Sequence, residues 1–368
     1  MTLWYLTTLT YPSTLANRLQ VMKMTEAFSR HADATLWVGS MGEKKRKVLE
    51  SYGVTGDLSI KELPKLFGIL WPQSFFRALT FRRIVREAPP ETIFYTRDLL
   101  LAFLLSFLSP RFRDNFFFEC HSLGKMPSMI YSRVFRSARG IVSTNKAKVE
   151  AIANTYGISA NRFLVAPNGF DPLLVPEKTR AEVRAELNLP EDKKIILYAG
   201  SLQAWKGTAL LAELSGRINK TLPGTVLVEF GAEREERDDF FWRFSTISVL
   251  QINKYMFAAD VLIAPYEKNS ERAQKYFSPI KIMEYLASGT PTVATDLPSI
   301  REVAGDEELF FVQDYRVEEF ERVIKKVLTN PEESARRAQK GRDRVQRYSW
   351  DKRAEGIVLF LRGLMGAE

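Results

Sequence analysis

The strongest structural signal in this chain runs Ser278-Pro-Ile-Lys-Ile-Met-Glu284-Tyr-Leu-Ala-Ser-Gly289-Thr-Pro-Thr-Val-Ala-Thr-Asp296. Its first part predicts a short helix over about 279–288, because a Ser-Pro pair suits a helix start and Gly289 suits a helix stop. Apolar segments at 260–265 and 290–295 flank this helix, and each predicts a buried strand. A strand, a helix and a strand in this order indicate a right-handed crossover in a parallel sheet.

The connection at 266–277 leaves the carboxyl end of the first of these strands, the edge at which open parallel sheets bind ligands. It leads to a helix start, where free amide groups favour an anion. Lys281 lies in the first turn and Glu284 three residues later, so both project from neighbouring surface. A phosphate held by Lys281 and a sugar hydroxyl held by Glu284 suit this arrangement. The alternative is an exposed Lys–Glu pair on the helix surface.

A second segment suited to phosphate follows the strand predicted over 193–199. It runs Gly200-Ser-Leu-Gln-Ala-Trp-Lys206-Gly207 and leads into a helix predicted over 208–218. Glycines let a backbone approach a phosphate, and Lys206 adds a mobile positive charge. The spacing differs from that of a Walker loop, which needs a hydroxyl directly after the lysine. A solvated loop lysine is the alternative.

Length and composition indicate a globular protein with two domains: the chain has 368 residues, of which 45% are hydrophobic and 26% charged. The lone Cys120 excludes an internal disulfide and fits a reducing compartment, so a cytoplasmic location is expected. His31 and His121 are the only histidines, and no metal-ligand spacing is present, so no metal site is expected. The longest apolar run, 99–108, is about half as long as a membrane-spanning helix.

Residues 1–170 alternate short apolar strands with helical stretches, the pattern of a doubly wound α/β domain. The turn after the first strand, 10–14, lacks a glycine-rich phosphate fingerprint, which argues against a dinucleotide-dependent oxidoreductase. Pro-Asn-Gly at 167–169 is a strong turn signal, and a domain boundary is expected near 170–190. In the second half, strands are predicted at 225–230 and, more weakly, at 248–252.

Positive charge concentrates in the first half of the chain. Residues 1–170 carry 23 Lys and Arg against 12 Asp and Glu, a balance of +11, whereas the remainder carries 30 against 32, a balance of −2. Aromatic and basic residues mix at 66–86, which predicts either a core-facing helix with a basic outer side or a surface that meets an anionic bilayer. The residues concerned are Trp71, Phe75, Phe76, Arg77, Arg82, Arg83 and Arg86. No nucleic-acid partner is expected.

Polar residues follow two predicted strands of the first half. Arg97 follows the strand at 91–96, and His121 follows the strand at 115–120. Both are therefore expected at the carboxyl edge of the sheet, where active sites form. A histidine that titrates near neutral pH can donate a hydrogen bond to a sugar oxygen or a phosphate. A structural histidine that caps a loop is the alternative.

The pattern Ser-Pro-x-Lys-x-x-Glu-Tyr-x-Ala-x-Gly-x-Pro-x-Val-Ala-Thr-Asp resembles a variant of the donor-binding signature of the family 4 retaining glycosyltransferases, which have the GT-B fold. Pro-Asn-Gly-Phe-Asp at 167–171 and the Lys206-Gly207 turn extend this resemblance over most of the chain. The resemblance implies an α/β protein with two Rossmann-like, doubly wound domains, 1–170 and 171–349, that face a central cleft. It also implies a C-terminal helix, 350–368, that crosses back to the first domain.

The implied activity is that of a retaining, metal-independent hexosyl- or related transferase, which needs no cofactor. It would move a sugar from a UDP- or GDP-linked donor to the hydroxyl of a lipid-linked or glycan acceptor, in glycolipid, polysaccharide or glycoconjugate assembly. His121, Lys206 and Lys281 would act in catalysis. The implied donor-binding residues are Gly200, Ser201, Lys206, Tyr276, Phe277, Ser278, Pro279, Ile280, Lys281 and Glu284, and the implied acceptor-side residues are Pro12, Ser13 and Arg97.

Two positions depart from the family pattern, since Tyr276 stands where many members have Glu and Ser201 where they usually have Arg. Two alternatives to the transferase stay open, and these departures bear on the second. One is a GT-B epimerase or a phosphorylase-like enzyme that acts on the same class of donor. The other is a lapsed transferase that serves as a binding module at the membrane surface. A peripheral position at the inner face of the membrane fits both the transferase and this module.

Overall fold

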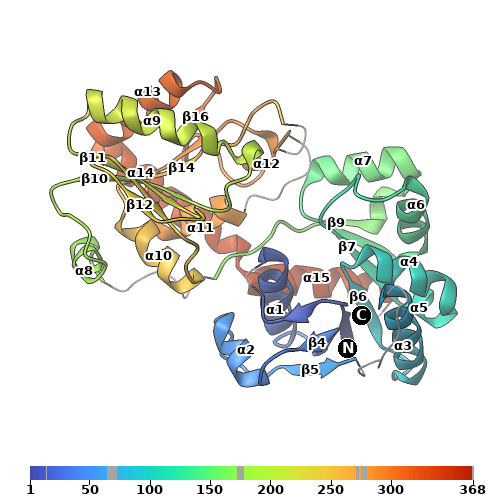
Figure 1. Cartoon of the computed structure of the whole chain (residues 1–368). Coiled ribbons are helices and arrows are strands. Elements are labelled where there is room, and N and C mark those ends of the chain that lie inside the picture. The colour runs from blue at the N-terminus through green and yellow to red at the C-terminus, as the bar shows by residue number, and fades with distance from the viewer. Residues whose placement is uncertain (14, 64–72, 172–177, 271–272, 275–279, 367–368) are drawn as a thin grey trace. The chain divides into compact units, whose positions relative to one another are not determined.

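The computed structural model describes residues 1–368 apart from 14, 64–72, 172–177, 271–272, 275–279 and 367–368 (Figure 1). It divides into two compact units, of which the first comprises 1–168 with 350–368 and the second 169–349. The sequence predicts that the first domain ends at residue 170, whereas the first unit of the structure ends at residue 168 before it resumes at 350. Each unit is built on a seven-stranded sheet, and both have the doubly wound α/β form expected from the alternation of strands and helices.

The first sheet is parallel throughout. Its strand order is β5 (Ser59–Glu62), β3 (Asp33–Val38), β1 (Thr2–Leu6), β6 (Ile93–Thr96), β7 (Phe116–Cys120), β8 (Gly140–Ser143) and β9 (Phe163–Val165). Alternate residues of β1 enter opposite core layers, because side chains alternate across a strand: Leu3 and Tyr5 join one buried cluster, Trp4 and Leu6 another. Both faces of the sheet are thus covered, as a parallel sheet requires.

Helices supply the rest of these two layers. The Leu3 layer contains α1 (Ala16–Phe28), α2 (Lys45–Ser51) and α15 (Trp350–Met365). The Trp4 layer contains α3 (Gln73–Glu87), α4 (Leu99–Leu108), α5 (Pro110–Asp114), α6 (Ser128–Ser137) and α7 (Lys146–Tyr156). Two short strands, β2 (Thr10–Tyr11) and β4 (Ser40–Met41), form a separate parallel pair, and the 3-10 helix η1 (Ala160–Arg162) precedes β9.

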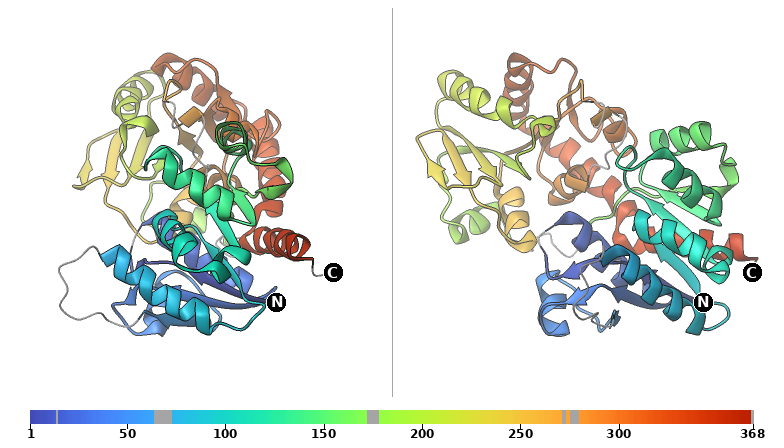
Figure 2. Two further views of the ribbon diagram at one scale, coloured as in Figure 1. Left: turned by 90° about the vertical axis from the view of Figure 1, so that its right-hand side faces the viewer. Right: turned by 45° about the vertical axis from the view of Figure 1, so that its right-hand side comes forward.

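The last helix of the chain belongs to the first unit. Helix α15, drawn in red in Figures 1 and 2, packs against α1. Trp350, Ala354, Ile357 and Leu361 are buried at spacings of three and four residues, so one face of this helix completes the core beside the first sheet. The predicted return of the C-terminal helix to the first domain is therefore confirmed.

The second sheet is parallel except for an antiparallel edge pair. Its order is β12 (Glu236–Arg237), β13 (Phe241–Phe244), β11 (Thr225–Phe230), β10 (Lys194–Ala199), β14 (Val261–Ala264), β15 (Thr292–Thr295) and β16 (Phe310–Val312). One core layer holds α8 (Arg180–Glu186), α10 (Val249–Ala258), α11 (Ile280–Ser288), α12 (Pro298–Arg301) and the end of α14 (Pro331–Val345), and the other holds α9 (Thr208–Thr221) and α13 (Val317–Thr329). The 3-10 helices η3 (Ala204–Lys206) and η5 (Gln346–Tyr348) connect these elements.

The crossover predicted around the signature segment is present. Strands β14 and β15 pair in parallel with Leu262 opposite Thr292, and α11 connects them. Gly289 ends α11 with φ of 70°, as its position in the sequence indicates. The predicted residues Tyr276, Phe277, Ser278 and Pro279 lie outside the described residues.

One local prediction is wrong. Residues 248–252 do not form a strand but begin helix α10, in which the Ser248 side chain accepts a hydrogen bond from the Gln251 amide. The strand in this region is β13, formed by Phe241–Phe244. Short apolar runs do not distinguish a strand from the start of a buried helix, and the cap at Ser248 decides for the helix here.

The described part of the 66–86 segment is a helix that packs one side against the core, which is the first of the two structures predicted for it. Phe81 and Val85 are fully buried, whereas Arg82, Arg83 and Arg86 are exposed. Trp71 lies outside the described residues, as do the side chains of Phe75, Phe76 and Arg77. Among the described residues, none of the helices combines the length and the apolar character that crossing a bilayer requires.

Gly207 allows a close approach of two loops in the second unit. Its φ is 75°, and a Cβ at this position would lie 1.7 Å from the carbonyl oxygen of Pro265. Gly207→Ala should therefore lower the free energy of unfolding by about 2–4 kcal/mol, through both backbone strain and steric overlap. Denaturant titration of the purified protein measures this change.

Gly216→Ala is the matched control for that variant. Gly216 lies inside helix α9, and a Cβ there would meet nothing within 4 Å. Because alanine favours helix, this change should stabilise the protein by about 0.5–1 kcal/mol. Equal effects of the two substitutions would contradict the role assigned to Gly207.

Candidate functional site

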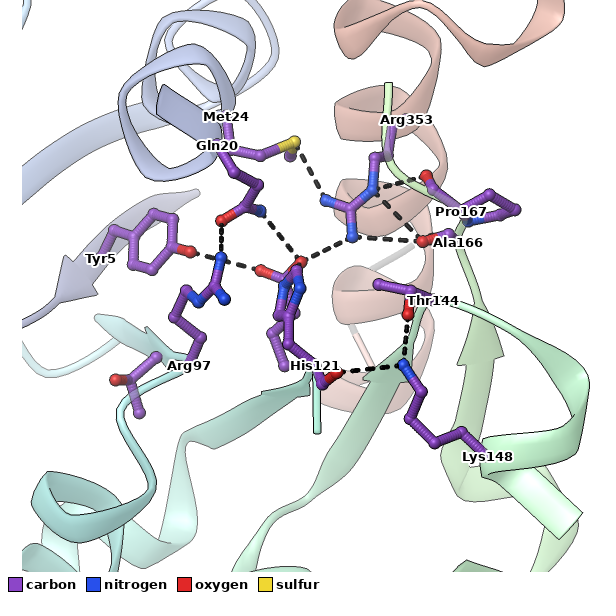
Figure 3. Close-up of polar contacts among 12 residues, drawn as sticks. Tyr5, Gln20, Met24, Arg97, His121, Thr144, Lys148, Ala166, Pro167 and Arg353 are labelled. Carbon is purple, nitrogen blue, oxygen red and sulfur yellow. Dashed lines mark hydrogen bonds and ion pairs between the residues drawn. The ribbon is translucent and has the colours of Figure 1, made fainter. Parts of the chain in front are cut away.

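A buried carboxylate lies at the carboxyl end of β7 in the first unit. Glu119 is fully buried, and its Oε1 accepts hydrogen bonds from Arg353 Nη2 at 2.6 Å and from Gln20 Nε2 at 3.0 Å, and it lies 2.8 Å from His121 Nε2. The Tyr5 hydroxyl donates to Oε2 at 3.3 Å. In Figure 3 the side chains of Tyr5, Gln20, His121 and Arg353 converge from β1, α1, the end of β7 and α15.

The charge of Glu119 is stabilised despite its burial. Burial by itself would raise the pKa of this carboxyl, but Arg353, His121 and Arg97 outweigh that effect and hold the pKa well below its usual range. Arg353 is itself buried, and its Nε donates to the carbonyl oxygen of Pro167 at 2.8 Å. This ion pair therefore ties α15 to the centre of the first sheet.

His121 is neutral at physiological pH. Burial first, and then the nearby Arg97, lower its pKa to about 3, although Glu119 acts in the opposite direction. The imidazole keeps a limited path to solvent, since 16% of its side chain is exposed. The structure thus places the predicted catalytic histidine at the carboxyl edge of the sheet, in an environment that resists protonation.

Two further cations flank this histidine. Arg97 Nη1 donates to Gln20 Oε1 at 2.5 Å, which joins Arg97 to the hydrogen-bond network around Glu119. Lys148 Nζ donates to the carbonyl oxygen of His121 at 3.3 Å and to the hydroxyl of Thr144 (Figure 3). The carboxyl edge of the first sheet therefore carries positive charge, which suits a ligand with anionic or electron-rich oxygen atoms.

The predicted acceptor-side residues do not all gather there. Arg97 belongs to the Glu119 network, whereas Pro12 and Ser13 lie in the loop after β2. Ser13 exchanges hydrogen bonds with the Tyr52 hydroxyl at 2.7 Å through both its amide and its carbonyl group. In the described part of the chain, no hydrogen bond connects Ser13 to the Glu119 network.

In the second unit, a buried lysine nitrogen lies beside the carboxyl end of β10. Lys281 Nζ lies 3.7 Å from the centroid of the Tyr198 ring, and a Cβ on Gly200 would meet this nitrogen at 2.5 Å. The nitrogen is buried and has no hydrogen-bond acceptor among the described residues. Burial, followed by the charge of Lys206, lowers the pKa of Lys281 well below its usual value. Burying a charged ammonium group without a partner is costly, so this arrangement suits an anionic ligand.

Other predicted donor-binding residues surround this cation. Lys206 Nζ donates to Ser201 Oγ and lies 5.5 Å from the centroid of the Trp205 ring, which in turn stacks on Tyr266. Gly200, Ser201 and Lys206 follow β10, while Ile280, Lys281 and Glu284 belong to α11. Burial raises the pKa of Glu284 to about 7, although Lys281 acts in the opposite direction.

Several residues of these two groups were not predicted from the sequence. They are Glu119, Arg353 and Gln20 in the first unit and Tyr198 in the second. One signal was available: Glu119 interrupts the otherwise apolar strand Phe-Phe-Phe-Glu-Cys and lies two residues before His121, on the same side of the strand. Nothing local could reveal Arg353, which is 234 residues from Glu119 in the sequence.

The match to a known family model lies in the second unit. Residues 179–344 match the family model described as Glycosyl transferases group 1. The chain is 23% identical over 241 residues to the D-inositol 3-phosphate glycosyltransferase of Segniliparus rotundus, an alignment that covers 61% of this chain and 52% of that protein. For the protein of the same name from Saccharomonospora viridis, identity is 25% over 258 residues, covering 64% and 58%. The chain thus spans about half the length of the curated relatives it matches.

Solved structures match over nearly the whole chain. Sucrose-phosphate synthase from Thermosynechococcus elongatus has a TM-score of 0.73 at 17% identity, with 100% of both chains covered. HepE of Anabaena in complex with UDP and glucose has a TM-score of 0.75 at 15% identity, covering 99% of this chain and 100% of that one. These likenesses confirm the GT-B fold, and the family match supports a glycosyltransferase. The finer identification of the Ser-Pro-x-Lys signature variant stays a prediction.

The raised pKa of Glu284 predicts how the stability of the protein depends on pH. Between pH about 4.5 and 7 the folded protein holds a proton that the unfolded chain releases, so this group's contribution to stability falls as pH rises through that window. Glu284→Gln removes the ionisation. The free energy of unfolding of the variant, relative to the wild type, should therefore increase from pH 5 to pH 8, by up to about 1.4 kcal/mol for each unit of pKa shift. Urea titration at both pH values measures it.

Glu333→Gln serves as the control for this experiment. Its side chain is 33% exposed, and hydrogen bonds from Arg336 and Arg337 lower its pKa to about 2. Both the folded and the unfolded states are then ionised from pH 5 upward, so the difference from the wild type should be nearly constant. If the difference in the free energy of unfolding is also constant for Glu284→Gln, the pKa of Glu284 is not raised in the folded protein.

Proposed function

We propose that this chain is a retaining, metal-independent glycosyltransferase of family 4, which moves a sugar from a nucleotide-sugar donor to an acceptor hydroxyl. The observation that carries the proposal is the buried Lys281 nitrogen, which has no acceptor among the described residues and lies inside the segment that matches the group 1 family model. A diphosphate would supply the missing anion. The Anabaena protein with a similar fold was solved with UDP-glucose, and a UDP-linked sugar is our first candidate donor, with a GDP-linked sugar as the second.

Lys281 and Lys206 have distinct roles in this proposal. The nitrogen of Lys281 is buried and held in place, whereas Lys206 lies at the end of η3 and is partly exposed. As the bond between the sugar and the diphosphate breaks, negative charge grows on the leaving phosphate oxygens. Cations already fixed near those oxygens stabilise the transition state more than the ground state, and that difference raises the rate. We infer that this pair takes the place that a divalent metal has in other transferases.

Glu284 is proposed to hold the ribose of the donor. A carboxylate accepts hydrogen bonds from neighbouring hydroxyl groups, and Glu284 lies one helical turn from Lys281 on α11. Its raised pKa reflects a buried carboxyl with few donors, a deficit that ribose hydroxyls would fill. His121 is proposed to contact the transferred sugar, and Arg97 to lie on the acceptor side.

The acceptor is proposed to be held at an anionic membrane surface, as a lipid-linked molecule or a glycan. The +11 balance of residues 1–170 supports this, as do exposed apolar side chains on two helices of the Trp4 layer. Phe107 is 59% exposed and Met129 71% exposed, and the guanidinium carbon of Arg133 lies 4.2 Å from the centroid of the Phe107 ring. Apolar and basic groups side by side are typical of peripheral membrane binding.

The decisive experiment for the activity is incubation with radiolabelled UDP- and GDP-sugars, with and without a hydroxyl acceptor. A transferase gives labelled product only when the acceptor is present, apart from slow hydrolysis. An epimerase or a phosphorylase-like enzyme converts the donor without any acceptor alcohol. A lapsed transferase binds the donor without turnover. The last two outcomes would replace the proposal with the corresponding alternative.

Lys281→Met tests the donor site. Loss of the ammonium group should weaken UDP-sugar binding by about 1.5–3 kcal/mol, the range for a hydrogen bond to a charged group. The fold should be at least as stable, because methionine fills a similar volume without a buried charge. Isothermal titration calorimetry and thermal unfolding measure the two effects.

Lys220→Met is the control, since Lys220 is exposed in the last turn of α9. It should leave both UDP-sugar affinity and stability unchanged. Wild-type affinity in Lys281→Met would remove Lys281 from the donor site and leave the family match as the main support for the function.

The membrane proposal predicts salt-sensitive binding to anionic vesicles. Arg82, Arg83 and Arg86 are exposed on α3, and each basic residue near an anionic surface contributes about 1 kcal/mol. Replacing these three arginines with Gln should therefore lower the partition coefficient on phosphatidylglycerol vesicles by about a hundredfold or more in low salt. Co-sedimentation measures the partition.

The comparison variant replaces Arg316, Arg322 and Arg347, which are exposed in the second unit, and it should bind the vesicles like the wild type. UDP-sugar binding should survive in both triple variants. A wild-type protein that ignores anionic vesicles in low salt would show that the acceptor is not membrane-held.

A further inference from the structure

The ring of His121 is held by only one of its two nitrogens. Nε2 lies 2.8 Å from Glu119 Oε1, and no hydrogen bond to Nδ1 is present within the described residues. Because 16% of the side chain is exposed, a small ligand group can still reach the ring. The chemical character of Nδ1, as donor or acceptor, therefore decides what His121 can recognise.

We propose that Glu119 is a positioning residue: it holds His121 as the neutral tautomer protonated on Nε2, so that Nδ1 accepts a hydrogen bond from a hydroxyl group of the sugar substrate. The substrate part of this inference rests on the proposed function, whereas the tautomer does not. The sequence suggests that His121 donates a hydrogen bond to the sugar, whereas in this proposal His121 accepts one.

The location of the proton follows from the partners of Glu119. Its two carboxylate oxygens accept from Arg353, Gln20 and Tyr5, so an ionised carboxylate is what the surroundings require. An ionised carboxylate has no hydrogen to donate. The hydrogen between Glu119 and His121 must therefore come from Nε2.

A second proton on the ring is disfavoured by the charges that face it from other elements. Arg97 lies after β6, Lys148 on α7 and Arg353 on α15, and all three are cationic. Together with burial, Arg97 and Lys148 lower the pKa of His121. Glu119 is the one anion in contact with the ring in the described part of the chain, and it is already shared with Arg353. Nδ1 therefore keeps a lone pair at neutral pH.

The orientation of the ring is determined at two points. Glu119 holds Nε2, and Lys148 holds the backbone through the carbonyl oxygen of His121. Lys148 is in turn fixed by the Thr144 hydroxyl. An accepting nitrogen in this fixed position binds a hydroxyl, which can donate, and repels an unprotonated phosphate oxygen, which cannot. His121 thereby distinguishes the sugar from the phosphates of a nucleotide sugar.

The tautomer can be read directly by nuclear magnetic resonance. The chain has 2 histidines, so a protein labelled with nitrogen-15 in histidine gives a simple spectrum, and His31→Gln assigns the remaining signal to His121. Two-bond proton–nitrogen correlations should show the Nε2–H tautomer, unchanged from pH 5 to pH 8. An Nδ1–H tautomer, or an imidazolium at neutral pH, would overturn the proposal.

A variant pair tests the part assigned to Glu119. Glu119→Gln alone leaves Arg353 buried without a counter-ion and can fail to fold. The double change Glu119→Gln with Arg353→Met removes both charges and keeps the packing volume. In that protein the Gln amide can donate to His121, so the Nε2–H tautomer should lose its dominance. A spectrum identical to that of the wild type would show that Glu119 does not determine the tautomer.

Donor analogues test the hydroxyl. A fluorine can accept a weak hydrogen bond but cannot donate one, so at one ring position both the deoxy and the deoxyfluoro nucleotide sugar should bind about tenfold more weakly than the parent. In His121→Ala this difference should vanish, while His31→Gln should keep it. A fluoro analogue that binds like the parent would show that His121 donates. Absence of any nucleotide-sugar binding would overturn the proposed function and the substrate part of the inference, and the spectrum would still decide the tautomer.

Discussion

The first unit depends on the ion pair between Glu119 and Arg353. Both groups are buried, and removing a charged pair from water costs free energy that only good hydrogen bonds offset. Here the carboxylate also accepts from Gln20, His121 and Tyr5, and the guanidinium also donates to backbone oxygens of 166 and 167. The same contacts that join β7 to α15 therefore orient the histidine at the edge of the sheet.

The second unit differs, because it buries a lysine nitrogen that has no hydrogen-bond partner among the described residues. The buried nitrogen of Lys281 has no acceptor in the part of the chain that the structure describes, and Glu284 on the same helix resists ionisation. A chain optimised for stability alone would replace both by apolar residues, so their presence is best explained by a ligand that supplies the missing partners. In each unit, then, unusual electrostatics mark the carboxyl edge of a parallel sheet, where doubly wound folds bind their ligands.

Local patterns were sufficient where the chain signals its own geometry. The Ser-Pro start and the Gly289 stop bound α11, and the apolar runs on either side form β14 and β15. Local patterns gave the wrong element at 248–252, because a short apolar run fits a strand and a helix equally well. The hydrogen bond that the Ser248 side chain accepts at the helix start favours the helix. The alternation of buried side chains identified the strands but could not tell which partner each strand would pair with.

The sequence by itself predicted the α/β class, a division into two domains, the glycine turn at 200–207 and candidate roles for Lys206, Lys281 and His121. Only the tertiary structure decided that His121 has Glu119 as its partner and stays neutral, and that the Lys281 nitrogen is buried away from any acceptor of the described residues. The physical reason is that backbone geometry follows from neighbouring residues, whereas the charge state of a side chain follows from everything packed around it. Arg353, which stabilises Glu119 from 234 residues away, is the clearest instance.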